Sequence, residues 1–321
     1  MSDMNSGVSV LMTAFNGMPY LQPAVESILN HTFDDFEFII VNDGSTEEST
    51  REYLDSITDP RVKVFHEPNR GTAGGSNFGL QHCTRKYVAR MDADDISLPT
   101  RLAEQYEFMQ ANADVSLVGT QLRIIGEENL GIEVQMPTDH DSIYSALLTL
   151  DHGMNHGSCF YRNELIKKIG GYWDVHKFHD DWDMFLRMGE VGRLANLPKI
   201  LFHYRTLPSS LVGSRWREMR EYFQYSVDCA NRRAAGQAER SPEEFFETLA
   251  KRPWLTRATE SLGIYSLAQY RIATAEICAQ QKVRGYSRLA WAAMCSPKRT
   301  LNRVARILSL GKAKKKLAQT E

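Results

Sequence analysis

The sequence lacks the features that mark disulfide-rich, zinc-binding and membrane-spanning proteins. Its five cysteines are far apart, odd in number and never in a Cys-x-x-Cys pair, which disfavours a disulfide framework and a zinc knuckle. No apolar run approaches the ~18–20 residues that cross a bilayer. The first twelve residues lack the basic and long apolar regions of a signal peptide. We therefore expect a reduced, cytoplasmic location.

The chain also lacks an overall excess of either charge. Lys and Arg number 38 against 40 Asp and Glu, for a formal net charge of −2, so the whole-chain balance points to no particular partner. The distribution is uneven, however. Residues 282–321 hold eleven Lys/Arg and one acidic residue, a net +10, which leaves −2 − 10 = −12 for the rest of the chain. The C-terminal region therefore needs its own interpretation.

The first hundred residues alternate between two kinds of apolar pattern. Short β-branched runs predict strands, and intervening segments with helical spacing predict helices. The predicted strands are 8–14, 36–45, 61–67 and 86–92, and the helical segments include 20–32 and 71–83. This alternation is typical of βαβ units and a mostly parallel sheet, in which ligands bind beyond the carboxyl ends of the strands.

The pattern after residue 97 is mixed. We expect strands near 115–125, 157–161 and 194–205, and helices near 98–112, 140–150, 162–169 and 179–192. From about Ser214 onward the chain has an almost wholly helical pattern, with breaks at Ser241-Pro242 and Arg252-Pro253. We expect an α/β domain over 1–210 and a helical extension over 211–321.

The strand predicted over 86–92 ends in a cluster of carboxylates, Asp92, Asp94 and Asp95. Asp92 and Asp94 are separated by one residue, so both can converge on a hard cation such as Mg²⁺ or Mn²⁺. The alternative is local, because Asp95 or Ser97 can cap the helix that begins near Pro99. The position at the end of a parallel strand favours the cation site.

Three blocks of the sequence stand out, in the order "VSVLMTAFNGMPYLQPAVESILNHTFDDFEFIIVNDGSTEEST", "YVARMDADDISLPTRLAEQ" and "GGYWDVHKFHDDWDMFLRM". Together they resemble inverting family 2 glycosyltransferases of GT-A fold, of the bacterial cell-surface polysaccharide type. The resemblance runs from about residue 7 to 206. It implies a GT-A α/β fold and transfer from a nucleotide-diphosphate sugar, with a UDP-sugar as the expected donor. It does not specify the sugar.

The resemblance implies roles on the donor side. The residues that would line the nucleotide base are Thr13, Ala14 and Phe15. Asp43 would accept a hydrogen bond from the base, Asp92 would approach the ribose, and Asp94 would bind the Mn²⁺ or Mg²⁺ ion that bridges the donor's diphosphate. A cation there would stabilise the leaving diphosphate as a Lewis acid. Asp43 has a simpler alternative as a turn residue in Asn-Asp-Gly-Ser.

Asp181, in "HDDWDMF", is the general base that the resemblance implies. An inverting displacement needs one carboxylate placed to take the proton of the acceptor hydroxyl. The alternative for Asp181 is an acid that complements the positive end of a helix dipole. Of its neighbours, Asp183 and Asp180 are expected to be structural, although Asp180 stands where the family usually has Glu. His156 and Asp180 are the further acceptor-side candidates.

The glycine-rich stretch "NRGTAGGSNFG" does not match the dinucleotide pattern Gly-x-Gly-x-x-Gly. We expect it to bring the backbone close to the nucleotide, with Arg70 and Asn77 as candidate contacts. Two other positions depart from the family. Asn42 replaces the first Asp of the usual Asp-Asp-Gly-Ser, and Leu207 or Pro208 stands where a His that caps the diphosphate is often found.

The basic region over 282–321 has two interpretations. Apolar residues of 296–317 fall on one helical face and cations mostly elsewhere, as in helices that lie on anionic membranes. The alternative is a terminal helix packed on the protein with a solvated lysine end. No nucleic-acid module is recognised.

We thus expect an inverting, metal-dependent glycosyltransferase whose acceptor is a glycan or lipid-linked saccharide, located in the cytoplasm, peripherally at the inner face of the membrane. The rival classes are a nucleotidyltransferase or other nucleotide-binding α/β enzyme, and a non-catalytic scaffold of the same fold. A nucleotide-binding α/β enzyme of another kind would need a glycine-rich first loop, and "TAFNGMPY" is not one. A non-catalytic scaffold would have lost the Asp-x-Asp or the base.

Overall fold

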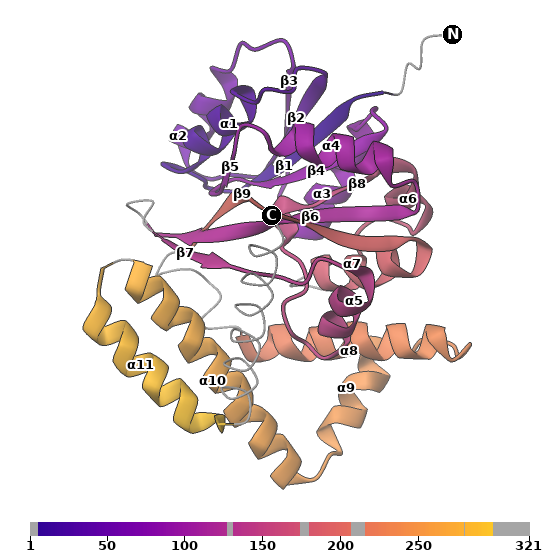
Figure 1. The fold of residues 1–321 in the computed structure, drawn as a ribbon, viewed down its shortest axis with the longest axis vertical. Helices are drawn as coiled ribbons and strands as arrows, with labels where there is room; N and C mark the ends of the chain where they lie inside the picture. The colour runs from indigo at the N-terminus through magenta and orange to yellow at the C-terminus, as the bar shows by residue number, and fades with distance from the viewer. Residues whose placement is uncertain (1–5, 127–130, 174–179, 207–215, 279, 298–321) are drawn as a thin grey trace, which may run out of the picture. The chain divides into compact units, whose positions relative to one another are not determined.

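The computed structural model describes residues 6–126, 131–173, 180–206, 216–278 and 280–297 (Figure 1). These residues form two compact units. The first consists of the described residues of Met1–Ile125, Gly131–Arg205 and Glu221–Pro242, and the second of those of Gly126–Leu130, Thr206–Arg220 and Glu243–Glu321. The domain boundary near residue 210 stays a prediction. Leu207, Pro208 and the basic tail after Pro297 lie outside the described residues.

The first unit is built on one mixed sheet. In the described part of the chain, nine strands pair in the order β3-β2-β1-β4-β8-β6-β9-β5, with β7 beside β6. The four leading strands are parallel: β1 (Val8–Ala14), β2 (Phe36–Asp43), β3 (Val62–Glu67) and β4 (Tyr87–Asp92). The others are β5 (Ile96–Ser97), β6 (Val115–Ile125), β7 (Gly131–Val134), β8 (Phe160–Arg162) and β9 (Arg193–Arg205). The predicted α/β class with a mostly parallel leading sheet is confirmed.

The sheet changes direction beside β4. The next strand, β8, is antiparallel to both β4 and β6, whereas β6 and β9 are parallel to each other. The short helix η1 (His156–Ser158) precedes β8 and contacts β4, β6 and β9. A segment from the second half of the unit is thereby placed beside the strand that ends in Asp92.

Helices cover this sheet in the expected places, with bounds that differ by a few residues from the sequence predictions. They are α1 (Leu21–Leu29), α2 (Glu48–Asp55), α3 (Gly71–His82), α4 (Arg101–Ala111), α5 (His140–Leu148), α6 (Asn163–Lys168) and α7 (Asp180–Val191). In α1 the buried side chains are Leu21, Ala24, Val25 and Ile28, the same residues that give its helical apolar spacing. The core between helices and sheet contains a large apolar cluster that includes Val10, Met12, Phe38 and Ile40.

Helix α3 packs unusually close to β1 and β2 because it has glycines on the face toward the sheet. A Cβ atom on Gly79 would lie 2.2 Å from Cδ1 of Leu11. One on Gly75 would lie 3.3 Å from Cγ2 of Thr13 and 3.4 Å from Cγ of Asp43. The glycine-rich stretch therefore brings a helix, rather than only a loop, against the ends of the two strands.

The remaining helices are α8 (Trp216–Ala234), α9 (Pro242–Ala250), α10 (Trp254–Cys278) and α11 (Lys282–Cys295). The starts of α9 and α10 coincide with the breaks predicted at Ser241-Pro242 and Arg252-Pro253. Within the second unit α10 and α11 form a hairpin (Figure 1). None of the described helices is long and apolar enough to cross a membrane.

Candidate active site

The carboxyl ends of β1, β2 and β4 lie side by side. Thr13 is opposite Asp92 across β1 and β4, and Ala14 is opposite Asn42 across β1 and β2, one residue before Asp43. The polar residues predicted at the strand ends are therefore adjacent, as parallel pairing requires. We call Asp43, Asp92, Asp94 and Asp95 the strand-end carboxylates.

Arg90 connects two of the predicted donor-side residues. Its Nη2 donates to Oγ1 of Thr13 at 2.9 Å and is 3.1 Å from Oδ1 of Asp92. Its Nη1 donates to the carbonyl oxygens of Leu11, at 3.3 Å, and Met91. The side chain is only 3% exposed. The buried guanidinium therefore fixes the orientation of the Thr13 and Asp92 side chains. The sequence analysis missed Arg90, although an arginine inside an otherwise apolar strand is a signal that could have found it.

Asp43 reaches across to the start of α3. Its Oδ1 accepts the backbone N–H of Arg70 at 2.7 Å. Burial raises the pKa of the Asp43 carboxyl, and the N–H groups of Arg70 and Gly71 oppose that rise. The adjacent turn is closed instead by Asn42, whose Oδ1 accepts the N–H of Ser45 at 3.0 Å. The turn interpretation thus suits Asn42, which replaces an aspartate of the family pattern.

Asp94 and Asp95 are held by the end of β9. Oδ1 of the buried Asp95 accepts the N–H of Arg205 at 2.7 Å, and Nε of Arg205 donates to the carbonyl oxygen of Asp94 at 2.8 Å. The Arg205 guanidinium also lies over the ring of Tyr20, 4.6 Å from its centroid. The interpretation of Asp95 or Ser97 as a helix cap is wrong, because α4 has Thr100 at its N-cap and no side-chain cap. Ser97 instead bonds His31.

The strand-end carboxylates repel one another. Desolvation by the surrounding atoms, and secondly the neighbouring Asp92, raise the pKa of Asp94 to about 6, even though its side chain remains accessible to solvent. Burial and the charges of Asp94 and Asp92 also raise the pKa of Asp95. Oδ2 of Asp95 has no hydrogen-bond partner among the described residues. Carboxylates that raise one another's pKa in this way favour a nearby cation.

The helix η1 presses directly against these carboxylates at Gly157. A Cβ atom there would lie 2.8 Å from Oδ2 of Asp92 and 3.0 Å from Oδ2 of Asp95. Arg101, which is fully buried, donates to the carbonyl oxygen of Gly157 at 2.8 Å and to that of Arg90 at 3.2 Å. Arg101 thus ties η1 to β4, with its guanidinium carbon 5.2 Å from the ring centroid of Phe202.

His156 extends this contact toward α7. Its Nε2 lies 2.9 Å from the hydroxyl of Tyr172, which lies 3.1 Å from the hydroxyl of the buried Tyr161. The imidazole also packs edge-on to Phe185 of α7, with ring centroids 6.3 Å apart. His156 therefore lies between the strand-end carboxylates and the helix that begins at Asp180.

The acids at the start of α7 differ in their surroundings. Asp183 is fully buried and pairs with Arg187, whose Nε lies 2.6 Å from Oδ2 of Asp183, so it has the structural role expected of it. Asp181 is half-buried and accepts the N–H of Trp182 at 2.9 Å. The side chain of Asp180 lies outside the described ones.

The thiol of Cys159 links the two acidic regions. It is completely buried directly after η1, and desolvation raises its pKa first, with the charges of Asp181 and Asp92 adding to that rise. Both carboxylates therefore lie within electrostatic range of one buried thiol. The helix η1 before it contacts both regions, because Gly157 lies against Asp92 and His156 packs on Phe185 of α7.

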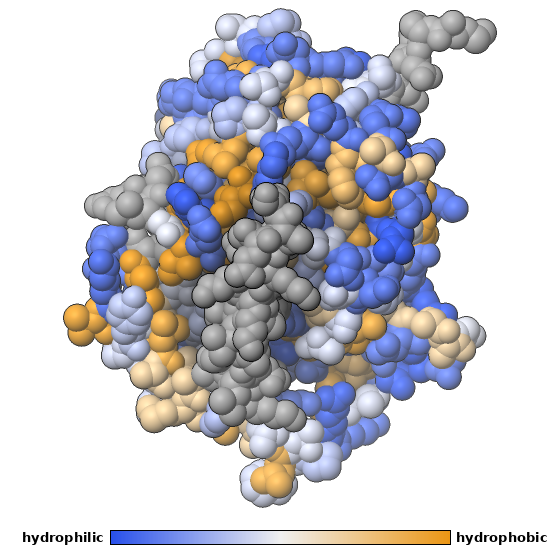
Figure 2. Space-filling view, in the orientation of Figure 1, coloured by the Kyte–Doolittle hydropathy of each residue, from blue (hydrophilic) through white to orange (hydrophobic). Residues whose placement is uncertain are grey.

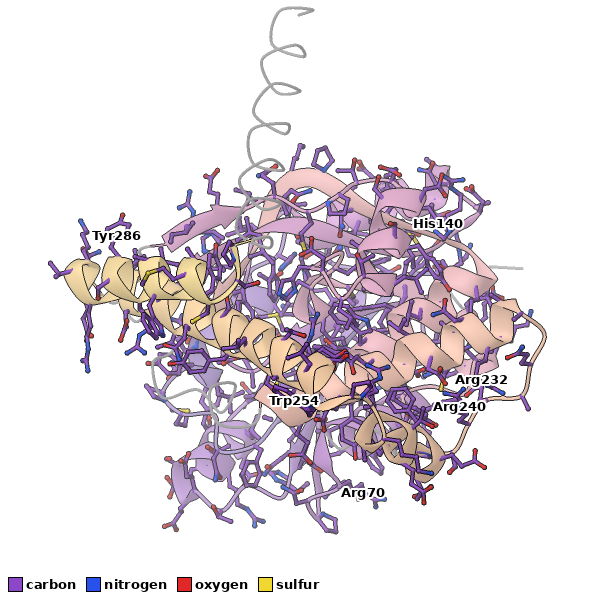
Figure 3. The ribbon with its side chains drawn as sticks, turned by 90° about the horizontal axis from the view of Figure 1, so that it is seen from below. Arg70, His140, Arg232, Arg240, Trp254 and Tyr286 are labelled. Carbon is purple, nitrogen blue, oxygen red and sulfur yellow. The ribbon has the colours of Figure 1, made fainter. Side chains whose placement is uncertain are left out.

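Two predicted nucleotide contacts also have partners within the protein. Both ends of the Asn77 amide bond the backbone of Tyr172: Nδ2 donates to its carbonyl at 2.7 Å and Oδ1 accepts its N–H at 2.9 Å. The side chain of Arg70, labelled in Figure 3, is half exposed and pairs with Glu67 at 2.7 Å. The phenyl ring of Phe15 is 50% exposed just after β1. Of these three, Phe15 and Arg70 have side chains that are accessible to a ligand.

A family model described as glycosyl transferase family 2 matches residues 9–170, half of the chain, including β1 to β4 and the strand-end carboxylates. The chain belongs to glycosyl transferase family 2. The predicted resemblance is confirmed, and the protein is a glycosyltransferase enzyme.

Curated relatives agree with this assignment. The O-antigen biosynthesis glycosyltransferase WbnJ of Escherichia coli is 32% identical over 203 residues, which cover 62% of this chain and 79% of WbnJ. An uncharacterized glycosyltransferase of Haemophilus influenzae is 31% identical over 211 residues, 62% of this chain. The match spans 65% of that protein's own length.

Solved structures share the GT-A fold. Residues 1–349 of TarS of S. aureus, in complex with UDP-GlcNAc, superimpose with a TM-score of 0.58 at 16% identity, covering 89% of each chain. The mannosyltransferase PcManGT of Pyrobaculum calidifontis, in complex with GDP-Man and Mn²⁺, gives a TM-score of 0.54 at 18% identity. That likeness covers 96% of this chain and 81% of PcManGT.

Proposed function

We propose that this family 2 enzyme transfers a sugar from a nucleotide-diphosphate sugar, with a UDP-sugar as the expected donor, to a hydroxyl group of a saccharide, with inversion at the anomeric carbon. The single observation that supports the proposal is that η1 contacts both acidic regions, with Gly157 against Asp92 and His156 against Phe185 of α7, the helix that holds Asp181. The UDP-GlcNAc complex of TarS supports the choice of donor.

The donor's nucleoside binds at the ends of β1, β2 and β4 in this proposal. Thr13, Ala14 and Phe15 line the base, Asp43 accepts a hydrogen bond from it, and Asp92 approaches the ribose. The orientation of Thr13 and Asp92 comes from Arg90, which bonds both side chains and is itself buried. A pre-oriented site of this kind avoids much of the entropic cost of ordering side chains when the donor binds.

The strand-end carboxylates fit a divalent cation. Asp94 is accessible to solvent, its pKa is raised by desolvation and then by Asp92, and Asp95 next to it has an unpartnered buried oxygen. Within the described part of the chain, no three His, Cys, Asp or Glu side chains form a complete metal cage. Mg²⁺ and Mn²⁺ are commonly held by one or two carboxylates with substrate phosphates as the other ligands. Asp94 would hold such an ion, which when bound neutralises charge on the leaving diphosphate.

The chemical step is a single displacement. The acceptor oxygen attacks the anomeric carbon, its proton passes to a carboxylate oxygen of Asp181, and the bond from that carbon to the diphosphate oxygen breaks, so the nucleoside diphosphate leaves with the electron pair. His156 and Asp180 are the acceptor-side residues in this proposal. The contact between His156 and Tyr172 supports the role of His156, because it holds the imidazole in place.

The acceptor is a glycan or lipid-linked saccharide of a cell-surface polymer. The names of WbnJ and of the Erwinia amylovora protein AmsE, which is 30% identical over 212 residues, concern O-antigen and amylovoran biosynthesis. We further propose that the enzyme works in the cytoplasm, at the inner face of the membrane, to which the basic region over 282–321 attracts it. The uneven charge of the sequence supports this location.

A donor screen tests the proposal. The enzyme is incubated with UDP- and GDP-sugars in the presence of Mn²⁺ or Mg²⁺, and nucleotide release is measured before and after EDTA is added. We expect release with at least one donor and its loss with EDTA. Failure to release nucleotide from any donor, together with no thermal shift by UDP or GDP plus metal, contradicts the proposal. A non-catalytic scaffold would show the thermal shift without the release.

A further inference from the structure

The α10–α11 hairpin of the second unit is tightly connected on its inner side. Oγ of Ser266 on α10 donates to the carbonyl oxygen of Ala292 on α11 at 2.7 Å. Gly285 lets the helices approach, because a Cβ atom there would lie 2.5 Å from Cγ1 of Ile277 and 2.9 Å from the carbonyl oxygen of Ala273. Helices α10 and α11 are therefore closely packed against each other, which holds the exposed side chains of the hairpin in place.

The two helices of the hairpin are rich in exposed apolar residues. Of eleven large apolar side chains that are exposed in the described residues, eight belong to these two helices: Trp254, Leu255, Leu262, Tyr265, Val283, Tyr286, Trp291 and Met294. The space-filling view shows apolar residues gathered at the surface over α11 (Figure 2). Such a concentration marks an interaction surface, since single scattered apolar residues are what an ordinary surface has.

The spacing of these residues aligns them. On α11, Val283, Tyr286 and Met294 share one face by the 3.6-residue period, and they are 87%, 59% and 65% exposed. Gly285 and Ala292, on the opposite face, are buried. Helix α11 thus has an inner face for its partner α10 and an outer face that is apolar.

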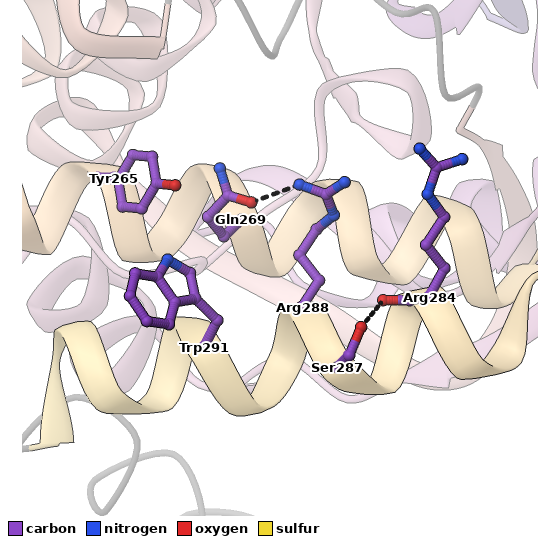
Figure 4. A pocket seen from close by; sticks show the side chains of 6 residues that line it. All are labelled: Tyr265, Gln269, Arg284, Ser287, Arg288 and Trp291. Carbon is purple, nitrogen blue, oxygen red and sulfur yellow. Dashed lines mark hydrogen bonds between the residues drawn. The ribbon is translucent and has the colours of Figure 1, made fainter.

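The two helices border a shallow hollow that is polar and positive. It has a volume of about 330 Å³ and is lined by Tyr265, Gln269, Arg284, Ser287, Arg288 and Trp291 (Figure 4). Arg288 bonds both oxygens of Glu276 at 3.0 Å, while Nε of Arg284 is 3.7 Å from the same carboxylate. One buried carboxylate therefore serves two guanidinium groups, and the side chain of Arg284 remains 72% exposed.

The charge of this region identifies the class of partner. Residues 254–295 hold five Lys/Arg and two Glu, a net 5 − 2 = +3, and α11 has three cations and no acid. The sequence that follows, 298–321, has eight Lys/Arg and one Glu, a net +7. The same hairpin of a second copy, or the tail itself, would bring like charge to the face. An anionic lipid surface matches both its charge and its Trp and Tyr residues, which prefer the membrane interface.

We propose that the outer face of α11 docks on an anionic membrane, with Val283, Tyr286 and Met294 inserted at the interface and the phosphate of a lipid headgroup in the hollow beside Arg284. We call these three apolar residues and Arg284 the hairpin face. The proposal does not depend on the proposed sugar transfer. It differs from attachment by the basic tail alone, because it requires Tyr286 and Met294.

Vesicle co-sedimentation of the full chain tests the hairpin face. The vesicles contain one-third phosphatidylglycerol in phosphatidylcholine, or phosphatidylcholine alone. We expect the wild type to bind the anionic vesicles and to bind the neutral ones several-fold more weakly. The Tyr286→Ser/Met294→Ser variant should lose about tenfold in binding to anionic vesicles. Arg284→Gln should lose about fivefold on the anionic vesicles, since one cation near an anionic surface is worth about 1 kcal/mol.

Matched changes on the first unit are the controls. Ile132→Ser removes an exposed apolar side chain, and Arg51→Gln removes an exposed cation, so both should bind vesicles as the wild type does. A chain without 298–321 separates the tail from the hairpin. The proposal is overturned if the Tyr286/Met294 variant pellets like wild type, or if only removal of the tail abolishes pelleting. It is equally overturned if the variant changes only the oligomeric state in sedimentation velocity.

Discussion

Arg90 is the single residue on which the geometry of the donor side depends most. Lysine at this position keeps the charge but cannot bond Thr13 and Asp92 while it also bonds two backbone carbonyls. We expect Arg90→Lys to weaken donor binding by roughly tenfold or more, since hydrogen bonds to charged groups contribute about 1.5–3 kcal/mol. Isothermal titration with the donor identified by the screen measures this change.

Arg162→Lys is the matched control for that experiment. Arg162 is also buried and bonds the carbonyl oxygens of Val115, Met109 and Asn112, away from the strand-end carboxylates. We expect it to lower the free energy of unfolding without changing the donor Kd. Equal donor affinity in wild type and Arg90→Lys would show that Arg90 only supports the fold.

Asp181 is predicted to act in the chemical step and not in donor binding. Asp181→Asn removes the proton acceptor while keeping the size of the side chain, so kcat should fall by about 10²–10⁴-fold. The KM for the donor and the melting temperature should stay close to those of the wild type. An unchanged kcat would show that Asp181 is not the base. It would then be an acid at the start of α7 that interacts favourably with the helix dipole.

Asp94 gives a pH dependence with a definite sign. Its pKa is raised from 3.8 to about 6 in the folded protein, so the charged form opposes folding, and this destabilisation develops as pH rises from about 4 to above 6. Without metal, Asp94→Asn should therefore be more stable than the wild type at pH 7, and this advantage should disappear as pH falls through 6 toward 4. Thermal melts of both proteins across this range, in EDTA, measure the difference. A stability difference that is constant with pH contradicts the shift.

The polar residues at the strand ends could be predicted from the sequence, but the buried residues that contact them could not. Asp43 and Asp92 could be placed because parallel strands end together. Arg101 and Gly157 could not, since their importance comes from a contact between α4, η1 and β4 that no local pattern encodes. The use of the Asn77 amide by Tyr172 is likewise a contact between residues 95 positions apart.

At the scale of elements, α3 depends on its glycines. Gly79→Ala places a methyl group 2.2 Å from Cδ1 of Leu11, so the helix must move away from β1 and β2. Overpacking of this kind costs about 1–3 kcal/mol. We expect that loss in the free energy of unfolding, together with weaker donor binding because Asp43 is held by the start of α3. Gln81→Ala, on the exposed face of the same helix, should change neither in urea denaturation and donor titration.

The elements of the βαβ region were predicted well because each has a strong period of its own. The strand expected at 157–161 is instead η1 followed by β8, which has only three residues. It is buried by pairing with β4 and β6 on either side, so tertiary pairing rather than local propensity creates it. β5 and β7 were missed for the same reason.

At the scale of the whole molecule, ligand binding should appear as added stability. A donor or its nucleoside diphosphate at about 100 times its Kd stabilises the folded state by about 2.7 kcal/mol. With Mn²⁺ present we expect a rise of several degrees in melting temperature for the wild type and for Asp181→Asn, and little rise for Asp94→Asn. Differential scanning fluorimetry with and without EDTA measures it. A full shift in Asp94→Asn would exclude Asp94 from metal-assisted binding.

The sequence predicted the family and the helical character of the C-terminal part. It could not predict that Glu221–Pro242 belongs to the first compact unit, because helices α8 and α9 have similar local patterns on both sides of that division. It also drew attention to the basic tail rather than to the hairpin face. The sequence alone does not show whether an aromatic residue of a helix is buried or exposed. Trp291 and Tyr286 could equally belong to a helix packed in the core, and only the structure shows that they are exposed.

The buried thiol of Cys159 can report the rate of local opening of the structure around it. A thiol with no solvent exposure and a raised pKa reacts with an alkylating reagent only when the surrounding structure opens. Cys159 follows η1, so its labelling rate under native conditions reports how often the contact between η1 and β4 breaks. Cys83 and Cys229 are also buried, so their labelling rates in the same reaction report the opening of other parts of the first unit. Mass spectrometry of the three peptides would thus time each opening separately, without any added probe.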